Sequence, residues 1–151
     1  MTQQQKNTAA LIAVIAGLTS IPLTWMTIYG GRLTAGEGSH LSIPIAKLYV
    51  TGVNGSITVI FQTPIWFIVG IAIAANVLQL MRNSRQFAIP RFAEWLAALF
   101  GVVWIGAGIS LTLFSDKVTL GIGSLLGLFC AGVALLCLVV PTSTQQDLLS
   151  R

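Results

Sequence analysis

Long apolar segments alternate with short polar stretches along most of the chain. Residues 8–28, 64–81, 90–114 and 118–140 are largely apolar, and about 20 such residues are enough for a helix to cross a bilayer. The third segment is the longest, so its helix has the length to tilt or to project beyond the bilayer. The pattern predicts an all-α transmembrane protein. It is a single domain, residues 1–151, with an up-down-up-down four-helix bundle and a small extracytoplasmic β-hairpin or sheet.

The outer segment between the first two spans, residues 29–63, has β-strand character. Asn54-Gly55 is the strongest short hairpin signal, because a type I′ turn needs positive φ at both central positions. This turn predicts a β-hairpin over residues 47–62. Side chains alternate between the two faces of a strand, so one face is wholly apolar and the other is mixed. The apolar face carries Leu48, Val50, Ile57, Val59 and Phe61, and the mixed face carries Tyr49, Thr51, Val53, Ser56, Thr58 and Ile60.

The entry into the second span has two interpretations. Thr63-Pro64 resembles a helix N-cap followed by proline at the first helical position, which starts the helix at Pro64. Alternatively, the helix begins near Ile57 and is kinked at Pro64. The β-branched residues between Ser56 and Phe61 favour a strand, and therefore the first interpretation.

Charged residues are scarce, and their placement indicates an orientation. They make up 8% of the chain, against roughly 25% in soluble domains. The bases behind the net charge of +4 are too scattered to indicate nucleic-acid binding. Three arginines and no acid lie in the short segment 82–91, and short basic loops stay in the cytoplasm. We therefore expect both termini in the cytoplasm and residues 29–63 outside, in a plasma, inner or thylakoid membrane.

Small residues recur at four-residue spacing on the last two predicted spans. The two strips are Ala93, Ala97 and Gly101 on the third span and Gly123, Gly127 and Ala131 on the fourth. In lipid, helices associate through such strips because no hydrophobic drive brings them together. Two interpretations stay open: packing inside the bundle, and self-association through the fourth span.

Glu94 is the only acid near a predicted span. In a tight helical hairpin around the basic loop, Glu94 lies near Gln79, with Asn76 about a turn deeper. An intramembrane carboxylate suggests a functional site by default. The alternative function is therefore a small oligomeric transporter or channel whose polar path is lined by these three residues. Glu94 also lies in the first turn of its helix, where the dipole favours an anion, so a structural role competes.

The chain lacks the residues for a catalytic site. It has one histidine, His40, and four acids, too few for a Ser/His/Asp or Cys/His set. His40 with Glu37 is short of the ligands that a metal site needs. Cys130 and Cys137 would be about 10 Å apart along a helix, too far for a disulfide. We predict no enzyme activity and no cofactor, while bound lipid or pigment stays open because neither needs a readable motif.

The order of these features resembles the claudin-like tetraspan proteins. The resemblance rests on four spans, a long first outer segment whose strand Val50–Phe61 leads into the second span, and a short second outer segment. Trp25 is the only candidate for the family's first signature tryptophan, and no outer cysteine pair is present to staple the sheet. The resemblance implies a small sheet on top of the bundle that contacts neighbouring molecules laterally or head-on.

These features together predict a non-enzymatic membrane protein that assembles through its outer hairpin and its small-residue helix faces. Besides membrane lipid, its partner is another copy in a homo-oligomer, or a larger membrane complex in which it is an accessory subunit. Nucleic acid is not expected. Assembly would use edge or face pairing of the hairpin. The residues predicted to bind the partner are Leu48, Tyr49, Val50, Thr51, Thr58, Val59 and Phe61.

Overall fold

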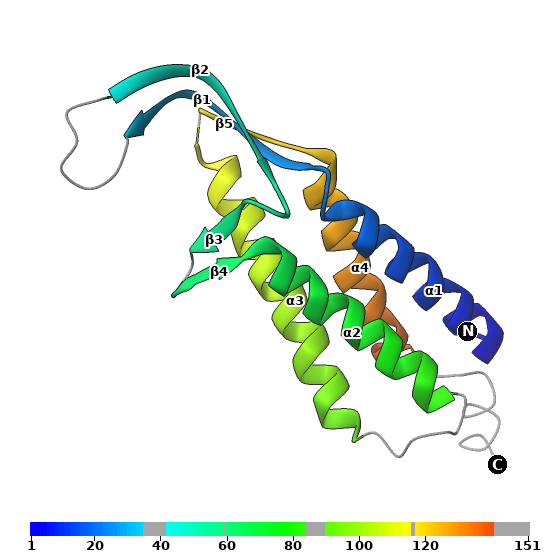
Figure 1. Ribbon diagram of the computed structural model, residues 1–151. Helices are drawn as coiled ribbons and strands as arrows, with labels where there is room; N and C mark the ends of the chain where they lie inside the picture. The colour runs from blue at the N-terminus through cyan, green and yellow to red at the C-terminus, as the bar shows by residue number, and fades with distance from the viewer. Residues whose placement is uncertain (35–41, 59, 84–89, 116, 141–151) are drawn as a thin grey trace, which may run out of the picture.

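In the part of the chain that the structure describes, four α-helices lie side by side and carry small antiparallel sheets at one end (Figure 1). The computed structural model describes residues 1–34, 42–58, 60–83, 90–115 and 117–140. The helices are α1 (Gln3–Ser20), α2 (Ile65–Asn83), α3 (Arg91–Leu113) and α4 (Ile122–Val139). The strands are β1 (Thr24–Thr34), β2 (Ser42–Thr51), β3 (Ser56–Thr58), β4 (Gln62–Pro64) and β5 (Val118–Leu120).

Three of the described helices, α2, α3 and α4, are long and apolar enough to cross a membrane. Helices α2 and α4 are both central, since each packs against the other three helices. The core between the helices and the sheets is apolar, with Ile65 and Ile68 of α2 and Ile105 of α3 all fully buried. Large apolar side chains also cover the outer helix faces, as lipid-facing surfaces require: Leu96, Leu99 and Val103 of α3 are exposed.

Helix α1 is shorter than the predicted first span. The prediction extended the span to residue 28, but the helix ends at Ser20 and residues 24–34 form β1. Pro22 explains the end, because proline has no N–H for the helical hydrogen-bond ladder. The residues after it are rich in threonine and aromatics, which favour a strand. At its other end, α1 is fixed by a capping box between Thr2 and Gln5.

The predicted hairpin pairing over residues 47–62 is wrong. Strand β2 pairs antiparallel with β1, from Thr24↔Thr51 to Thr34↔Ser42, and β5 pairs with the other edge of β1, which gives the order β2-β1-β5. Strands β3 and β4 form a separate two-stranded sheet. The reason is the number of backbone hydrogen bonds, since β1 offers β2 a much longer ladder than residues 56–61 can. Pro44 is accommodated because β2 is an edge strand.

Asn54-Gly55 serves as a cap for α2 and not as a hairpin turn. Gly55 does not have the positive φ that a type I′ turn needs; among the described glycines only Gly30 does, at 70°. Instead, Asn54 Oδ1 accepts hydrogen bonds from the Thr51 N–H and hydroxyl, at 2.8 and 3.1 Å. The carbonyl of Gly55 then accepts the N–H of Ile65 at 3.0 Å. The turn thus satisfies a donor at the helix N-terminus that has no intrahelical partner.

The sequence-based start of α2 also needs correction. Thr63 and Pro64 are the last residues of β4, and the helix begins at Ile65. The alternative helix from Ile57 is excluded, because residues 56–58 form β3. Ile57 is buried against α3, and a Cβ on Gly108 would lie 2.7 Å from its Cδ1. This contact sets β3 directly on α3.

The fourth predicted span likewise begins with a strand. Residues 118–120 form β5 and pair with Met26–Ile28 of β1, so α4 starts only at Ile122. Three residues are too short a segment for their alternation to be visible in an apolar run. The strand brings the α3–α4 connection to the same end as β1 and β2 (Figure 1).

Trp25 joins the sheet to the helices. Its side chain is 1% exposed and its indole N–H donates to the Ser20 carbonyl at 2.8 Å. Helix α4 makes room for the ring with two glycines, because a Cβ on Gly123 or Gly127 would lie 2.7 or 2.5 Å from it. Contacts that close exclude any larger residue unless the ring moves. Trp25, the candidate for the first signature tryptophan of the claudin-like proteins, is therefore a core residue in this structure.

Candidate functional sites

The first candidate site is the ribbon formed by β1 and β2. Its pairing continues from Gly31↔Ile45 to Thr34↔Ser42. On the other edge of β1, backbone contacts with residues 117–120 end at Tyr29, whose N–H donates to the Lys117 carbonyl at 2.7 Å. Beyond that point the ribbon runs clear of the helices (Figure 1). The outer edge of β2 has no strand beside it among the described residues. An unpaired edge of this kind is a template for another strand.

Exposed aromatic and basic groups mark the base of the ribbon. Tyr49 is 58% exposed, and Tyr29 and Leu48 are also exposed. The Lys47 ammonium lies 5.5 Å from the centroid of the Tyr29 ring, a cation–π contact that contributes about 0.5–1 kcal/mol at an exposed site. Tyrosine is enriched at interfaces because one end is apolar and the other makes hydrogen bonds.

The structure divides the residues predicted to bind a partner between two places. Leu48, Tyr49 and Thr51 lie on β2, and Val50 of the same strand packs against the apolar core. Thr58 and Phe61 belong to the β3–β4 unit, where the Phe61 ring lies 4.8 Å from that of Trp104. Val59 lies outside the described residues. The described residues of the predicted binding face therefore lie in two separate sheet regions, and those on β2 are the candidate contact.

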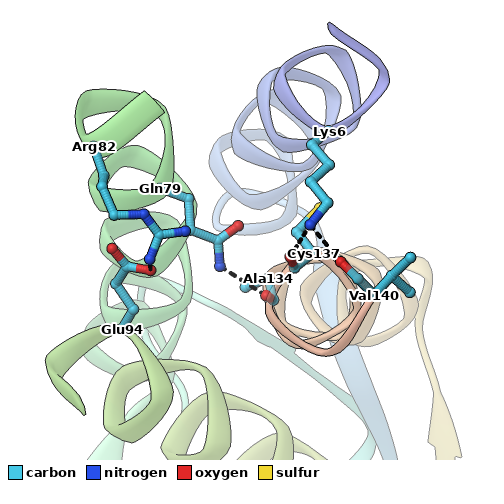
Figure 2. A network of polar contacts seen from close by, with 7 residues as sticks. All are labelled: Lys6, Gln79, Arg82, Glu94, Ala134, Cys137 and Val140. Carbon is cyan, nitrogen blue, oxygen red and sulfur yellow. Dashed lines mark hydrogen bonds and ion pairs between the residues drawn. The ribbon is translucent and has the colours of Figure 1, made fainter. Parts of the chain in front are cut away.

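The second candidate site is a buried polar cluster (Figure 2) at the end of the bundle away from the sheets (Figure 1). Arg82 of α2 forms an ion pair with Glu94 of α3, with Nη1 and Oε2 2.5 Å apart. The Glu94 side chain is fully buried, while that of Arg82 is 29% exposed. The other carboxylate oxygen of Glu94 has no hydrogen-bond partner.

Gln79 and Asn76 link α2 to α4 in the same region. Gln79 Nε2 donates to the Ala134 carbonyl at 2.7 Å, and Asn76 Nδ2 donates to the Cys130 carbonyl at 3.0 Å. Both side chains are buried, and Asn76 Oδ1 has no partner. The structure thus places the three residues of the predicted polar path in one buried region, where the two amides also hold helices together.

Lys6 ties α1 to the C-terminus of α4 (Figure 2). Its ammonium donates to the carbonyls of Cys137, at 3.0 Å, and of Val140. These carbonyls lie at a helix end, where unpaired oxygens and the dipole attract a cation.

The residues of the two small-residue strips make contacts with other elements of the same chain. A Cβ on Gly101 would lie 3.3 Å from the Cβ atoms of Ala131 and of Ala72, and Gly123 and Gly127 face Trp25. Ala97 packs against the buried alanines of α2, α3 and α4, and Ala93 is half-buried near the start of α3. These contacts are intramolecular, which favours packing within the bundle over self-association through α4.

In the part of the chain that the structure describes, no group of three or more His, Cys, Asp or Glu side chains lies close enough to hold a metal ion. Cys130 and Cys137 are both free and buried on α4. His40 and Glu37, the other sequence candidates, lie outside the described residues.

Sequence reasoning missed Lys6 and Arg82 as parts of the cluster. The available signal was the scarcity of charge, because each base in such a chain needs a specific place at a span end.

Comparison with models of known protein families, with curated proteins and with solved structures finds no match for this chain.

Proposed function

We propose that the protein is a non-enzymatic integral membrane subunit that joins a membrane assembly through its β1–β2 ribbon. One observation carries the proposal: the ladder continues to Thr34↔Ser42, although the backbone support on the other edge of β1, from β5 and Lys117, ends at Tyr29. A two-stranded ribbon is only marginally stable alone. A partner that pairs with the edge of β2 or covers its exposed face would stabilise it. That partner is another copy or a larger complex, as the resemblance to claudin-like proteins implies.

The proposal includes α1 as a fourth membrane-embedded helix. Its 18 residues span about 27 Å, and it packs against α2 and α4 over its length. Its exposed face is apolar over residues 11–18, with Leu11, Ile15 and Leu18 each more than half exposed. The basic segment 82–91 favours the cytoplasm for both termini, which puts the ribbon on the outer side.

Tyr49→Asp tests the ribbon. Tyr49 is 58% exposed on β2, so the change adds a charge to the proposed contact without disturbing the core. We expect the wild type, extracted in mild detergent, to elute as a uniform oligomer or with discrete extra subunits, and the variant to elute alone. Light scattering and mass spectrometry of the eluted peak measure both.

Val53→Asp is the matched control. Val53 is 62% exposed but lies in the turn after β2, outside the ribbon. We expect this variant to stay in the membrane fraction and to keep the wild-type assembly. If Tyr49→Asp also assembles like the wild type, the ribbon is not the contact and the proposal fails.

A second candidate function, transport, is favoured by the two unpaired oxygens of Glu94 and Asn76. A water or a proton bound between the helices would satisfy such acceptors. Glu94→Gln would then abolish proton-coupled flux in liposomes, measured with a pH-sensitive dye inside the vesicles. Flux equal to that of the wild type would remove Glu94 from any such path.

A further inference from the structure

The end of the bundle away from the sheets carries a surplus of positive charge. Helices α1 and α3 begin there and α2 ends there (Figure 1), so Lys6 of α1, Arg82 of α2 and Arg91 of α3 all lie toward this end of the bundle. Glu94 is the only acid among the described residues. Among the described side chains at this end, three positive against one negative leave a balance of +2. Any ligand that binds at this end must be compatible with its net positive charge.

Only one of the three bases is neutralised. The ion pair of Arg82 with Glu94 is the only one in the described part of the chain. Lys6 is held by main-chain carbonyls, which bind its ammonium without cancelling its charge. Arg91 is exposed at the start of α3 and forms no ion pair with a described residue. Lys6 and Arg91 are therefore the source of the surplus.

The charge balance decides which ligand this end attracts. The unpaired oxygen of Glu94 by itself would suggest a cation or a proton. However, a cation that approaches Glu94 also meets the uncompensated charges of Lys6 and Arg91, while an anion is attracted by both. An anion is the ligand that lowers the electrostatic energy of this end.

The surroundings of these charges point to an anion that belongs to a lipid. The outward faces of the helices next to the bases are apolar: Leu11 on α1, Val77 on α2, and Phe92 and Leu96 on α3 are exposed. A free anion makes no use of such surfaces. A phospholipid places its phosphate at the bases and its acyl chains along the apolar faces, as at basic pockets between membrane helices.

We propose that Lys6 and Arg91, together with the donors of Arg82 that Glu94 does not use, bind the headgroup of an anionic phospholipid. Glu94 acts as a positioning residue that holds Arg82 in place from α3. The site joins α1, α2 and α3, so bound lipid would stabilise their packing at this end. The inference needs the helices in a bilayer but not the ribbon contact, so either can fail without the other.

Binding is measured on the purified full-length protein in a neutral detergent. Phosphatidylglycerol is titrated and followed by native mass spectrometry and by the unfolding temperature. We expect saturable binding that raises the unfolding temperature and weakens with salt. Phosphatidylcholine and inorganic phosphate, added at the same concentrations, should have no such effect. An equal effect of either would overturn the proposal, since the charge or the acyl chains would then be irrelevant.

Arg91→Gln is the decisive variant, because it removes a charge without breaking an ion pair. A base near an anionic surface contributes about 1 kcal/mol, so we expect phosphatidylglycerol to bind about fivefold more weakly. Arg91→Lys should retain most of the affinity. Lys117→Gln, at the sheet end, is the matched control and should bind like the wild type. Wild-type affinity in Arg91→Gln, or an equal loss in Lys117→Gln, would refute the site.

Discussion

The two members of the Arg82–Glu94 pair should respond unequally to mutation. Arg82→Gln leaves a carboxylate that is fully buried and already has one unpaired oxygen. Removal of one partner from a buried ion pair costs about 3–5 kcal/mol. Because the Arg82 side chain is 29% exposed, we expect the lower value, about 3 kcal/mol, for the loss of unfolding free energy.

Glu94→Gln should cost less. The stranded group is then a guanidinium that can turn toward water, so the loss is that of a charge-assisted hydrogen bond, about 1.5 kcal/mol. The double variant Arg82→Gln/Glu94→Gln buries no charge and should be more stable than Arg82→Gln alone. Reversible unfolding in mixed micelles with increasing sodium dodecyl sulfate, followed by circular dichroism, gives the three values. If Glu94→Gln is as damaging as Arg82→Gln, the burial argument is wrong.

A further prediction compares Gly127 and Gly132, two glycines of α4 that differ in what surrounds them. Gly127→Leu forces a side chain into the Trp25 ring, where a Cβ alone would lie 2.5 Å away, and we expect a loss of about 1–3 kcal/mol in the same unfolding assay. Gly132→Leu meets nothing within 4 Å and should be neutral or slightly stabilising, because leucine has the higher helix propensity. Equal losses in the two variants would show that Trp25 does not fill this groove.

The sequence alone indicates the membrane class and most of the helices. Segments near residues 65–82, 91–113 and 122–139 are readable because helical hydrogen bonds are local and lipid requires apolar side chains on every outer face. The presence of strand in the first outer segment is readable for a similar reason, from its β-branched residues. The basic residues at the span ends are visible too, but their partners are not.

Only the tertiary structure decided which strands pair and which polar groups meet. Asn54-Gly55 has the local chemistry of a hairpin turn, yet β2 pairs with β1, because a ladder reaching from Thr24↔Thr51 to Thr34↔Ser42 outweighs a local turn. In the sequence, Trp25 is one residue of a predicted apolar span. In the structure, its ring packs in the space that Gly123 and Gly127 of α4 leave free. Lys6 meets the carbonyl of Cys137, and Arg82 meets Glu94, across separate helices. Such contacts join residues distant in sequence, so they depend on the packing of the whole bundle and not on any local pattern.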